Sequence, residues 1–379
     1  MKNVVIAGYC RSPFTPAKKG QLAIIRPDDL VSQVVKALLH KTRVDPDAIE
    51  DLILGCAFPE GEQGFNLARI IVHLADLPVT MGGTTVNRFC GSSMQAIHMA
   101  AGAIQMNAGE AFICAGVESM TRTPMGGFNL MPNPDLYARY PQAYIGMGET
   151  AENLARDYQI SRGAQEEFAL SSQQKAFAAQ QNGLFSDEII AITTPSGAVA
   201  LDGCIRPDST LAALAELKPA FLQNGSVTAG TASPVTDGAS AVLVCSETYA
   251  DAHGLDKLAR IKSYAVSGCL PEIMGIGPVQ ASHKALQRAG LQLADMDIVE
   301  LNEAFAAQAL AVLKELPIPP EKLNLDGGAI ALGHPLGATG ARITGKAASL
   351  LRREGKRYAL ATQCIGGGQG IATVLEAVS

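Results

Sequence analysis

The stretch DAIEDLILGCAF, residues 47–58, has a counterpart in ADMDIVELNEAF, residues 294–305. Each begins with a short amphipathic segment and continues into an apolar run that ends in Ala-Phe, a pattern that predicts a buried strand. Upstream of each lies a helix-like segment, PDDLVSQVVKALL at 27–39 and GPVQASHKALQRAG at 277–290. The two ends of the chain therefore resemble each other over a helix and a strand.

Two further strand-like runs extend this internal similarity. EAFICAGV at 110–117 matches RYALATQC at 357–364, and GASAVLVCSE at 238–247 matches GIATVLEA at 370–377. The offset is about 250 residues for the first three pairs but about 130 for the last. The chain is therefore predicted to fold as two similar α/β halves, the first of which contains an insertion.

The insertion is predicted to run from about residue 118 to about residue 237, within an N-terminal domain of residues 1–257. The C-terminal domain is predicted to take residues 258–379. The insertion contains a Pro-rich loop, a long helical stretch and Gly/Pro-rich loops. An insertion of this length between core strands usually carries function, often a substrate pocket or lid.

The composition limits the classes of function. Hydrophobic residues make up 47% of the chain, charged residues 17%, and the net charge is −6, so neither nucleic acid nor an anionic membrane surface is an expected partner. We expect no transmembrane segment and, since no targeting signal is visible, a cytoplasmic protein. The cysteines form no CxxC pair and no zinc-spaced cluster, so no metal site is predicted.

The motif NRFCGSS at residues 87–93 places Cys90 between a strand-like run and a helix-like run. Free amides and the positive end of a helix dipole favour a thiolate at such a junction, and Gly91 would let a substrate approach the backbone closely. The arrangement is similar to a nucleophile elbow with sulfur in place of oxygen. A buried cysteine is nonetheless usually a small core residue, so this motif alone leaves catalysis and packing equally open.

Two polar motifs follow in the second half. Asn302 comes directly after the buried run IVEL, where it could hold a water or orient a carbonyl group, or cap a helix. His334 lies in the glycine-rich segment GGAIALGHPLGATGAR, residues 327–342, which does not match a nucleotide-binding P-loop. A lone histidine is usually structural, although a segment with so little side-chain bulk makes that interpretation weaker.

Cys364 ends a strand-like run and opens CIGGGQG, residues 364–370. Three successive glycines after a strand expose backbone N–H groups that can bind an oxyanion, and a redox thiol is the alternative. A cysteine hydrolase would need only Cys90, His334 and Asn302. A second thiol fits better with a carbon–carbon bond made or broken beside a thioester, which needs an acyl carrier, a second acid/base and two oxyanion sites.

Together, NRFCGSSMQA, NEAFAAQ, GGAIALGHPLGATGAR and CIGGGQG resemble the thiolases, in the expected order from residue 3 to residue 376. The resemblance implies a thiolase-like α/β fold, in which two similar halves with five-stranded mixed sheets pack in layers and a loop domain is inserted in the first half. It also implies that no cofactor is tightly bound and that CoA and acyl-CoA are substrates.

The resemblance implies a role for each reactive residue of these motifs. Cys90 becomes acylated, and His334 activates it. His334 and a water held by Asn302 stabilise the thioester enolate. Cys364 is the acid/base at the α-carbon, and the N–H groups of Cys90 and Gly366 form a second oxyanion hole.

The resemblance also implies five binding residues. They are Ser233 and Ala229 in the pantetheine loop, Arg206 near the adenine nucleotide, and Met147 and Phe305 in the pantetheine and acyl pocket. One departure from the family pattern is Pro234, which stands where a glycine often follows the serine.

Gly146 stands where biosynthetic acetoacetyl-CoA thiolases commonly have histidine. The missing bulk favours a longer acyl chain, so the predicted reaction is thiolytic cleavage of a 3-ketoacyl-CoA in fatty-acid β-oxidation. The alternatives are an acetyl-CoA acetyltransferase, a decarboxylating condensing enzyme and a non-catalytic acyl-binding relative. The resemblance further implies a homodimer or homotetramer, and docking to a hydratase/dehydrogenase subunit occurs among degradative members.

Overall fold

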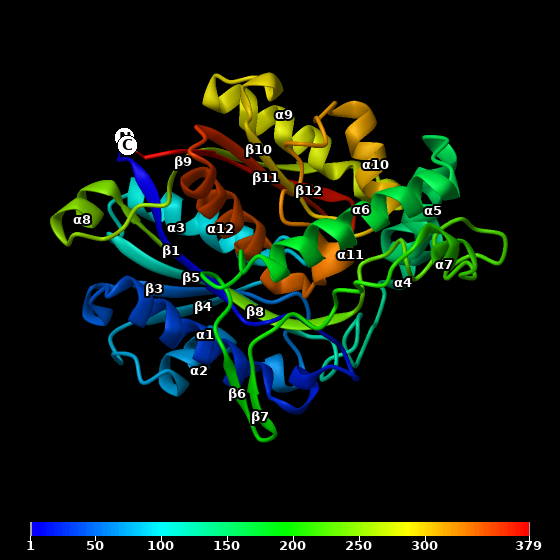
Figure 1. Ribbon diagram of the computed structural model, residues 1–379. Helices are drawn as coiled ribbons and strands as arrows, with labels where there is room; N and C mark the ends of the chain where they lie inside the picture. The colour runs from blue at the N-terminus through cyan, green and yellow to red at the C-terminus, as the bar shows by residue number, and fades with distance from the viewer. Residues whose placement is uncertain (1, 379) are drawn as a thin grey trace.

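One large mixed β-sheet runs through the computed structural model, which describes residues 2–378 (Figure 1). Its strands lie in the order β10-β11-β12-β9-β1-β8-β5-β3-β4, and the short β2 pairs with β8. The bounds are β1 (Val4–Arg11), β2 (Thr15–Pro16), β3 (Asp51–Gly55), β4 (Gly82–Val86), β5 (Ala111–Ser119), β8 (Thr236–Ser246), β9 (Ala259–Gly268), β10 (Ile298–Leu301), β11 (Tyr358–Ile365) and β12 (Gln369–Glu376). Residues 1 and 379, the outermost of the two predicted domains, lie outside the described residues.

The two halves of the sheet repeat one pattern of strands. In the first half β3 is parallel to β5, and β5, β8 and β1 follow antiparallel to one another. In the second half β10 is parallel to β11, and β11, β12 and β9 follow antiparallel. β4 lies parallel to β3, and its counterpart beside β10 is a single bridge between Val299 and Leu323. The predicted two-half fold is confirmed, and the halves are joined because β1 and β9 pair at Val5–Arg260 and Ile6–Ala259.

Helices form three layers around the two half-sheets (Figure 1). One outer layer covers the first half, another covers the second, and a middle layer lies between them. The outer helices are α1 (Pro27–Thr42) and α2 (Leu67–Leu74), then α9 (Gly277–Ala289) and α10 (Ala306–Glu315), and the middle helices are α3 (Ser92–Gln105) and α12 (Leu336–Glu354). Both faces of each half-sheet are therefore buried, which explains the nearly continuous apolar runs of its strands.

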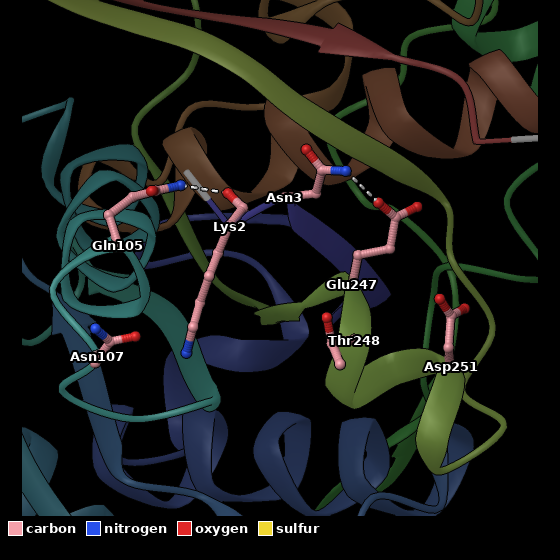
Figure 2. A pocket seen from close by; sticks show the side chains of 7 residues that line it. All are labelled: Lys2, Asn3, Gln105, Asn107, Glu247, Thr248 and Asp251. Atoms are coloured by element: carbon pink, nitrogen blue, oxygen red, sulfur yellow. Dashed lines mark hydrogen bonds between the residues drawn. The ribbon is translucent and has the colours of Figure 1, made fainter.

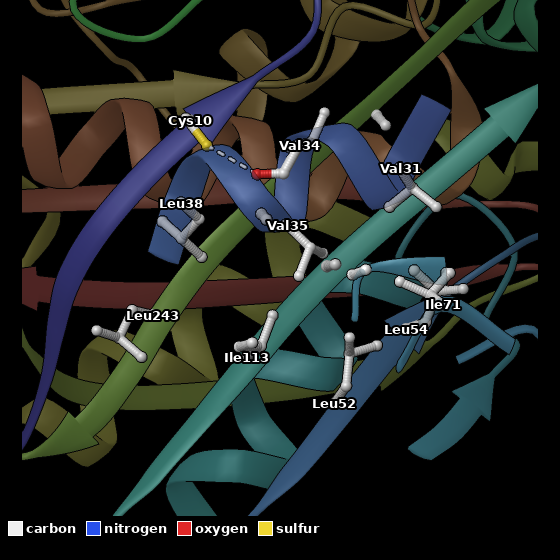
Figure 3. Packing of buried hydrophobic residues seen from close by; sticks show 14 of the residues in the cluster. Cys10, Val31, Val34, Val35, Leu38, Leu52, Leu54, Ile71, Ile113 and Leu243 are labelled. Carbon is white, nitrogen blue, oxygen red and sulfur yellow. Dashed lines mark hydrogen bonds between the residues drawn. The ribbon is translucent and has the colours of Figure 1, made fainter. Parts of the chain in front are cut away.

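The packing of α1 on the first half-sheet shows how these runs are used (Figure 3). Val34 and Leu38 of α1 belong to the same buried cluster as Ile113 and Leu243 of the strands below. Cys10 lies in this cluster and its thiol donates to the Val34 carbonyl at 3.5 Å. This cysteine is a core residue, as cysteines usually are.

The middle helices α3 and α12 pack directly against each other. A Cβ atom on Gly340 would lie 2.3 Å from the backbone nitrogen of Met94, so the two backbones approach as closely as a glycine allows. Ser93 Oγ also accepts a hydrogen bond from the Ala341 N–H at 2.8 Å. Cys90 stands two residues before α3, and His334 stands two residues before α12. This helix pair therefore brings the two predicted reactive turns to the same end of the middle layer.

Between β5 and β8 the chain leaves the sheet and forms a set of helices and two short strands (Figure 1). They are α4 (Pro134–Arg139), α5 (Met147–Asp157), α6 (Arg162–Gln181), β6 (Ile192–Thr194), β7 (Gly197–Val199) and α7 (Leu211–Ala215). The remaining helices are α8 (Glu247–Ala252) and α11 (Ala329–Leu332). The domain boundary at residues 257 and 258 falls between α8 and β9 and stays a prediction, as do the limits of the insertion.

Within residues 2–378, no helix combines the length and the apolar character needed to cross a membrane.

We expect Gly340→Ala to lower the free energy of unfolding by about 1–3 kcal/mol, because the added methyl group would overpack the α3–α12 contact. Gly163→Ala in α6 is the matched control, since a Cβ there meets nothing within 4 Å. That control should be neutral or stabilising by about 0.5 kcal/mol. Urea unfolding compares the two, and equal midpoints would contradict the proposed tightness of the contact.

Candidate active site

Cys90 lies in a tight turn between β4 and α3. Phe89, one residue earlier, has a φ of 42°, in the left-handed region that bulky residues rarely adopt. Asn87 Oδ1 accepts a hydrogen bond from the Phe89 N–H at 2.8 Å. Ser92 Oγ accepts from the Arg88 N–H at 2.9 Å and donates to the Phe89 carbonyl at 2.6 Å. The polar side chains of the motif thus hold a strained turn that presents the thiol.

The Cys90 side chain is half-buried and packs with Phe58, Met120 and Leu336. Burial raises the pKa of the thiol to about 11, and hydrogen bonding by the backbone N–H groups of Gly366 and Cys90 lowers it only in part. The sequence predicts that the helix end favours a thiolate. In the free protein that prediction is wrong, because desolvation outweighs both hydrogen bonds and leaves a neutral thiol at pH 7. Attack by this sulfur therefore needs a base.

His334 and Asn302 meet in a buried corner between α12 and β10. His334 Nε2 lies 3.4 Å from Asn302 Nδ2, and His334 Nδ1 lies 2.6 Å from Thr339 Oγ1. Burial, with a smaller contribution from the charge of Arg342, lowers the pKa of His334 to about 3. The imidazole is therefore neutral at pH 7 and can accept a proton.

The alternative role of Asn302 as a helix cap is wrong. The following helix, α10, has Phe305 at its N-cap and no side-chain cap hydrogen bond. Asn302 Oδ1 is buried, and it has no hydrogen-bond partner among residues 2–378. A buried acceptor without a partner indicates a place for a donor that is not part of the chain.

Buried carboxylates hold the segments around His334, and sequence reasoning did not assign them a role. Glu303 accepts hydrogen bonds from Ser172 Oγ at 2.6 Å and from Asn324 Nδ2 at 2.7 Å. It also accepts from the Ile330 N–H at 3.2 Å, inside the glycine-rich segment that leads to His334. The sequence offered one sign of this role, an acidic residue at the end of an apolar run. A carboxylate is buried at such a place only when hydrogen-bond donors surround it.

Glu118, at the end of β5, plays the same part for the start of α12. It accepts hydrogen bonds from the Gly337 N–H at 2.9 Å, the Ala57 N–H at 2.8 Å and Gln63 Nε2 at 2.8 Å. One buried carboxylate thus joins β5, the loop after β3 and the first turn of α12.

Cys364 is fully buried near the end of β11. Burial raises the pKa of its thiol well above the usual value, and the nearby Cys90 raises it further. Gly367 and Gly368 turn the chain into β12 with φ of 76° and 82°, conformations that glycine adopts without strain. This turn directs the Gly366 N–H toward the Cys90 sulfur. The two thiols therefore share one site, and both are free in the structure.

Two of the five predicted binding residues share an apolar cluster with Cys364, and a third, Ser233, lies along the NEAF segment. Met147 and Phe305 belong to the same apolar cluster as Cys364. The Met147 sulfur lies 3.5 Å from the position that a Cβ on Gly366 would take. The Ser233 N–H donates to the carbonyl of residue 304 at 3.0 Å, so its loop runs along the NEAF segment.

The other two predicted binding residues are exposed. Ala229 lies in the same loop as Ser233, four residues earlier in the chain. Arg206 lies on a separate loop, where its backbone N–H donates to Gln173 Oε1 of α6 at 2.8 Å. Their side chains are therefore available to a ligand that approaches from solvent.

A polar surface hollow of about 610 Å³ lies elsewhere on the molecule (Figure 2). Gln105, the last residue of α3, lines it together with Asn3 and Glu247, whose side chains are joined at 2.7 Å. Cys90 precedes the opposite end of this 14-residue helix, about 20 Å away at the usual rise per residue. None of the predicted site residues lines this hollow.

The site therefore combines two neutral thiols, a neutral imidazole, a primary amide and two backbone donors. One thiol is supplied with donors for an oxyanion, and the second lies against an apolar wall. This combination can carry an acyl group on one sulfur while the other exchanges a proton with a carbon atom.

Comparisons with known proteins agree with this chemistry. Residues 4–248 match the family model described as Thiolase, N-terminal domain, and residues 255–377 match Thiolase, C-terminal domain. A 3-ketoacyl-CoA thiolase of Bacillus subtilis (strain 168) is 45% identical, over 99% of this chain and 100% of its own length. One of Shewanella denitrificans is 49% identical over 100% of both chains. The human mitochondrial 3-ketoacyl-CoA thiolase in complex with CoA is 40% identical, with a TM-score of 0.92, over 100% of this chain and 98% of its own.

We expect iodoacetamide to label Cys90 and Cys269 and to spare the other cysteines at pH 8. Both are half-buried and burial raises the pKa of each to about 11, whereas burial raises the pKa of the buried Cys10, Cys204 and Cys245 to about 12. Because the thiolate is the reactive form and these pKa values are raised, the labelling rate should keep rising from pH 8 to pH 10. Peptide mass spectrometry follows the modification. A rate that levels off below pH 7, or earlier labelling of Cys204 or Cys245, would contradict this description.

Proposed function

The chain belongs to the thiolase family, and from this membership we propose that it cleaves a 3-ketoacyl-CoA with CoA to give acetyl-CoA and a shortened acyl-CoA. Full-length relatives with this activity in their names support the degradative reaction over an acetyl-CoA acetyltransferase. The observation that carries the proposal is the shared site of Cys90 and Cys364. A cysteine hydrolase or a decarboxylating enzyme would have no use for the second thiol.

The first half of the reaction transfers an acyl group to Cys90. His334 takes the proton from the Cys90 thiol, and the sulfur attacks the β-keto carbon. The developing oxyanion accepts hydrogen bonds from the N–H groups of Cys90 and Gly366, which already point to the sulfur. The bond between the α- and β-carbons then breaks, and its electron pair forms the enolate of acetyl-CoA.

The second thiol and the His334–Asn302 pair serve the leaving enolate. Protonated His334 donates to the enolate oxygen through Nε2–H, and a water bound to the unpartnered Asn302 Oδ1 donates to the same oxygen. Cys364 gives its proton to the α-carbon, and acetyl-CoA leaves. Its buried thiol has a raised pKa, so the proton remains on sulfur until a carbanion forms nearby.

The second half of the reaction returns every group to its starting state. An incoming CoA thiol gives its proton to the Cys364 thiolate and attacks the acyl thioester at Cys90. The same two backbone donors hold the second oxyanion, and Cys90 leaves and recovers its proton from His334. The burial of His334 and both thiols as neutral groups fits this scheme, because charge is created only when substrate is present.

CoA is proposed to bind on the insertion. The Ser233 loop along the NEAF segment and the apolar pair Met147 and Phe305 support a pantetheine channel that ends at Cys364. Phe221 meets Phe305 edge-on at 5.7 Å and extends the same wall outward. Exposed Ala229 and Arg206 are proposed to contact the outer part of CoA, and a guanidinium group suits its phosphates.

A homodimer is proposed from the free edge of β4. This strand ends the sheet path, so one of its edges carries backbone groups that no other strand within residues 2–378 pairs. The segments that precede β4 in the chain carry exposed apolar side chains, among them Phe65, which is 95% exposed, and Val79. A second copy of the chain would cover both features. Assembly into a homotetramer, docking to a hydratase/dehydrogenase subunit and a cytoplasmic location stay predictions.

Cys364→Ala tests the assignment of the second thiol. The variant should still carry an acyl group on Cys90 after incubation with an acyl-CoA, because His334 can pass the proton that it takes from Cys90 to the departing CoA thiolate. Cleavage of a 3-ketoacyl-CoA should fall by at least about 1000-fold, since the carbanion loses its proton donor. Mass spectrometry detects the acyl group and the disappearance of the 3-ketoacyl-CoA chromophore measures cleavage. Full cleavage by the variant would refute the proposed mechanism.

Gly146→His tests the acyl-chain preference. Gly146 is the exposed N-cap of α5, directly before Met147, and a Cβ there meets only Glu149, at 3.4 Å or more. The native protein should turn over 3-ketohexadecanoyl-CoA, and the variant should lose about tenfold or more of this rate because the ring occupies the path of the chain. Turnover of acetoacetyl-CoA by the same variant is the control and should change less than about twofold. A native protein inert on the long substrate would overturn the role given to Gly146.

A further inference from the structure

Two residues of the reactive motifs have no part in the mechanism above. Arg88 stands two residues before Cys90, and Gln369 stands three residues after Gly366. Their side chains are in direct contact, because Arg88 Nη1 donates a hydrogen bond to Gln369 Oε1 at 2.8 Å. This hydrogen bond joins residues 281 positions apart and connects the turn of the first half to the turn of the second.

The guanidinium group of Arg88 is fixed from its own side. Its Nε donates to Gln95 Oε1 on α3 at 2.9 Å, and its backbone N–H is held by Ser92 Oγ at 2.9 Å. Arg88 is therefore oriented by the same turn and helix that position Cys90. Because the guanidinium group is planar and rigid, fixing its Nε also orients the Nη1 that donates to Gln369.

The amide of Gln369 continues the connection to the oxyanion donor. Its Nε2 lies 3.5 Å from the Gly366 carbonyl, within the β11–β12 turn. The Cys269 N–H holds the end of that turn by donating to the Gly368 carbonyl at 2.8 Å, whereas the start of the turn is loosely packed. Gly367 is exposed, and Gly366 has no neighbour closer than 3.5 Å to the place where its Cβ would be. Without side chains of their own, these glycines depend on an outside partner for their position.

A second hydrogen bond runs parallel to the first. Gln363, which precedes Cys364, donates from Nε2 to the Cys90 carbonyl. The turn that carries Cys90 is thus connected at two points to the strand and turn that carry Cys364 and Gly366. The outer connection, between Arg88 and Gln369, is the one that reaches the Gly366 turn.

We propose that Arg88 and Gln369 form a clasp that sets the spacing between the Cys90 and Gly366 N–H groups, and that both are positioning residues for the oxyanion hole of acyl transfer. The proposal rests on the function proposed above. An oxyanion hole works only when its donors are held where the charge develops. A small shift of the Gly366 turn therefore reduces the stabilisation of the transition state and leaves the affinity for CoA unchanged.

The test measures exchange of isotopically labelled CoA into hexanoyl-CoA, which passes through acyl-Cys90 and breaks no carbon–carbon bond. Gln369→Met keeps the length of the side chain and removes the hydrogen bond. We expect its kcat for exchange to fall about tenfold with KM for CoA within about twofold, since complete loss of an oxyanion donor costs roughly 100- to 1000-fold. Arg88→Met should give a similar loss, and the double variant should lose no more than either single one.

Arg288→Met is the control, because Arg288 is exposed and, among the residues that the structure describes, donates only to the Tyr264 carbonyl, at 2.7 Å, in the strand β9 and not in either turn. All rates are divided by the fraction of protein that is folded, so a loss of stability is measured separately. An unchanged kcat in Gln369→Met, a rise in KM that accounts for the loss, or losses that multiply in the double variant would each overturn the clasp. Failure of the native protein to exchange label would instead overturn the proposed function.

Discussion

The close approach of α3 and α12 is the constraint on which the site depends. Cys90 and His334 come from opposite halves of the chain, yet each precedes one of these helices by two residues. A glycine makes the approach possible, because a Cβ on Gly340 would lie 2.3 Å from the backbone of α3. Another glycine, Gly116, lets α12 lie equally close to β5, since a Cβ there would lie 2.2 Å from the Gly337 carbonyl oxygen. Protein interiors are packed too densely to absorb such overlaps. The contact between α3 and α12 therefore fixes the positions of the two reactive turns.

Buried carboxylates fix the backbone segments that carry the site residues. Glu118 ties the first turn of α12 to β5, and Glu303 ties the glycine-rich segment to α6 through Ser172. Burial raises the pKa of both groups, and hydrogen bonds from backbone and side-chain donors oppose the rise. A buried acid is tolerable only with such donors, so each one fixes the backbone segments that supply them.

The two halves divide the chemistry between them. In the proposed mechanism the first half supplies the acyl carrier, and the second supplies the imidazole, the amide, the second thiol and the Gly366 donor. In the free protein the imidazole and both thiols are neutral, because burial lowers the pKa of His334 and raises that of each thiol. In the proposed mechanism, Cys90 therefore becomes nucleophilic only in the complex with substrate, where the fixed N–H donors stabilise the negative charge as it develops.

The sequence alone determined the repeat, the α/β class and the four motifs, because strands buried on both faces leave continuous apolar runs and reactive residues interrupt them where strands end. The motif around Cys90 left packing and chemistry open by itself, and only the other three motifs and the family resemblance favoured chemistry. The sequence left open whether Asn302 caps a helix, because that depends on the residue at which α10 begins. Only the tertiary structure revealed the roles of Glu118, Glu303 and Thr339 and the meeting of Arg88 with Gln369. It also corrected the expected thiolate at Cys90, since desolvation depends on everything packed around a group and not on the helix that follows it.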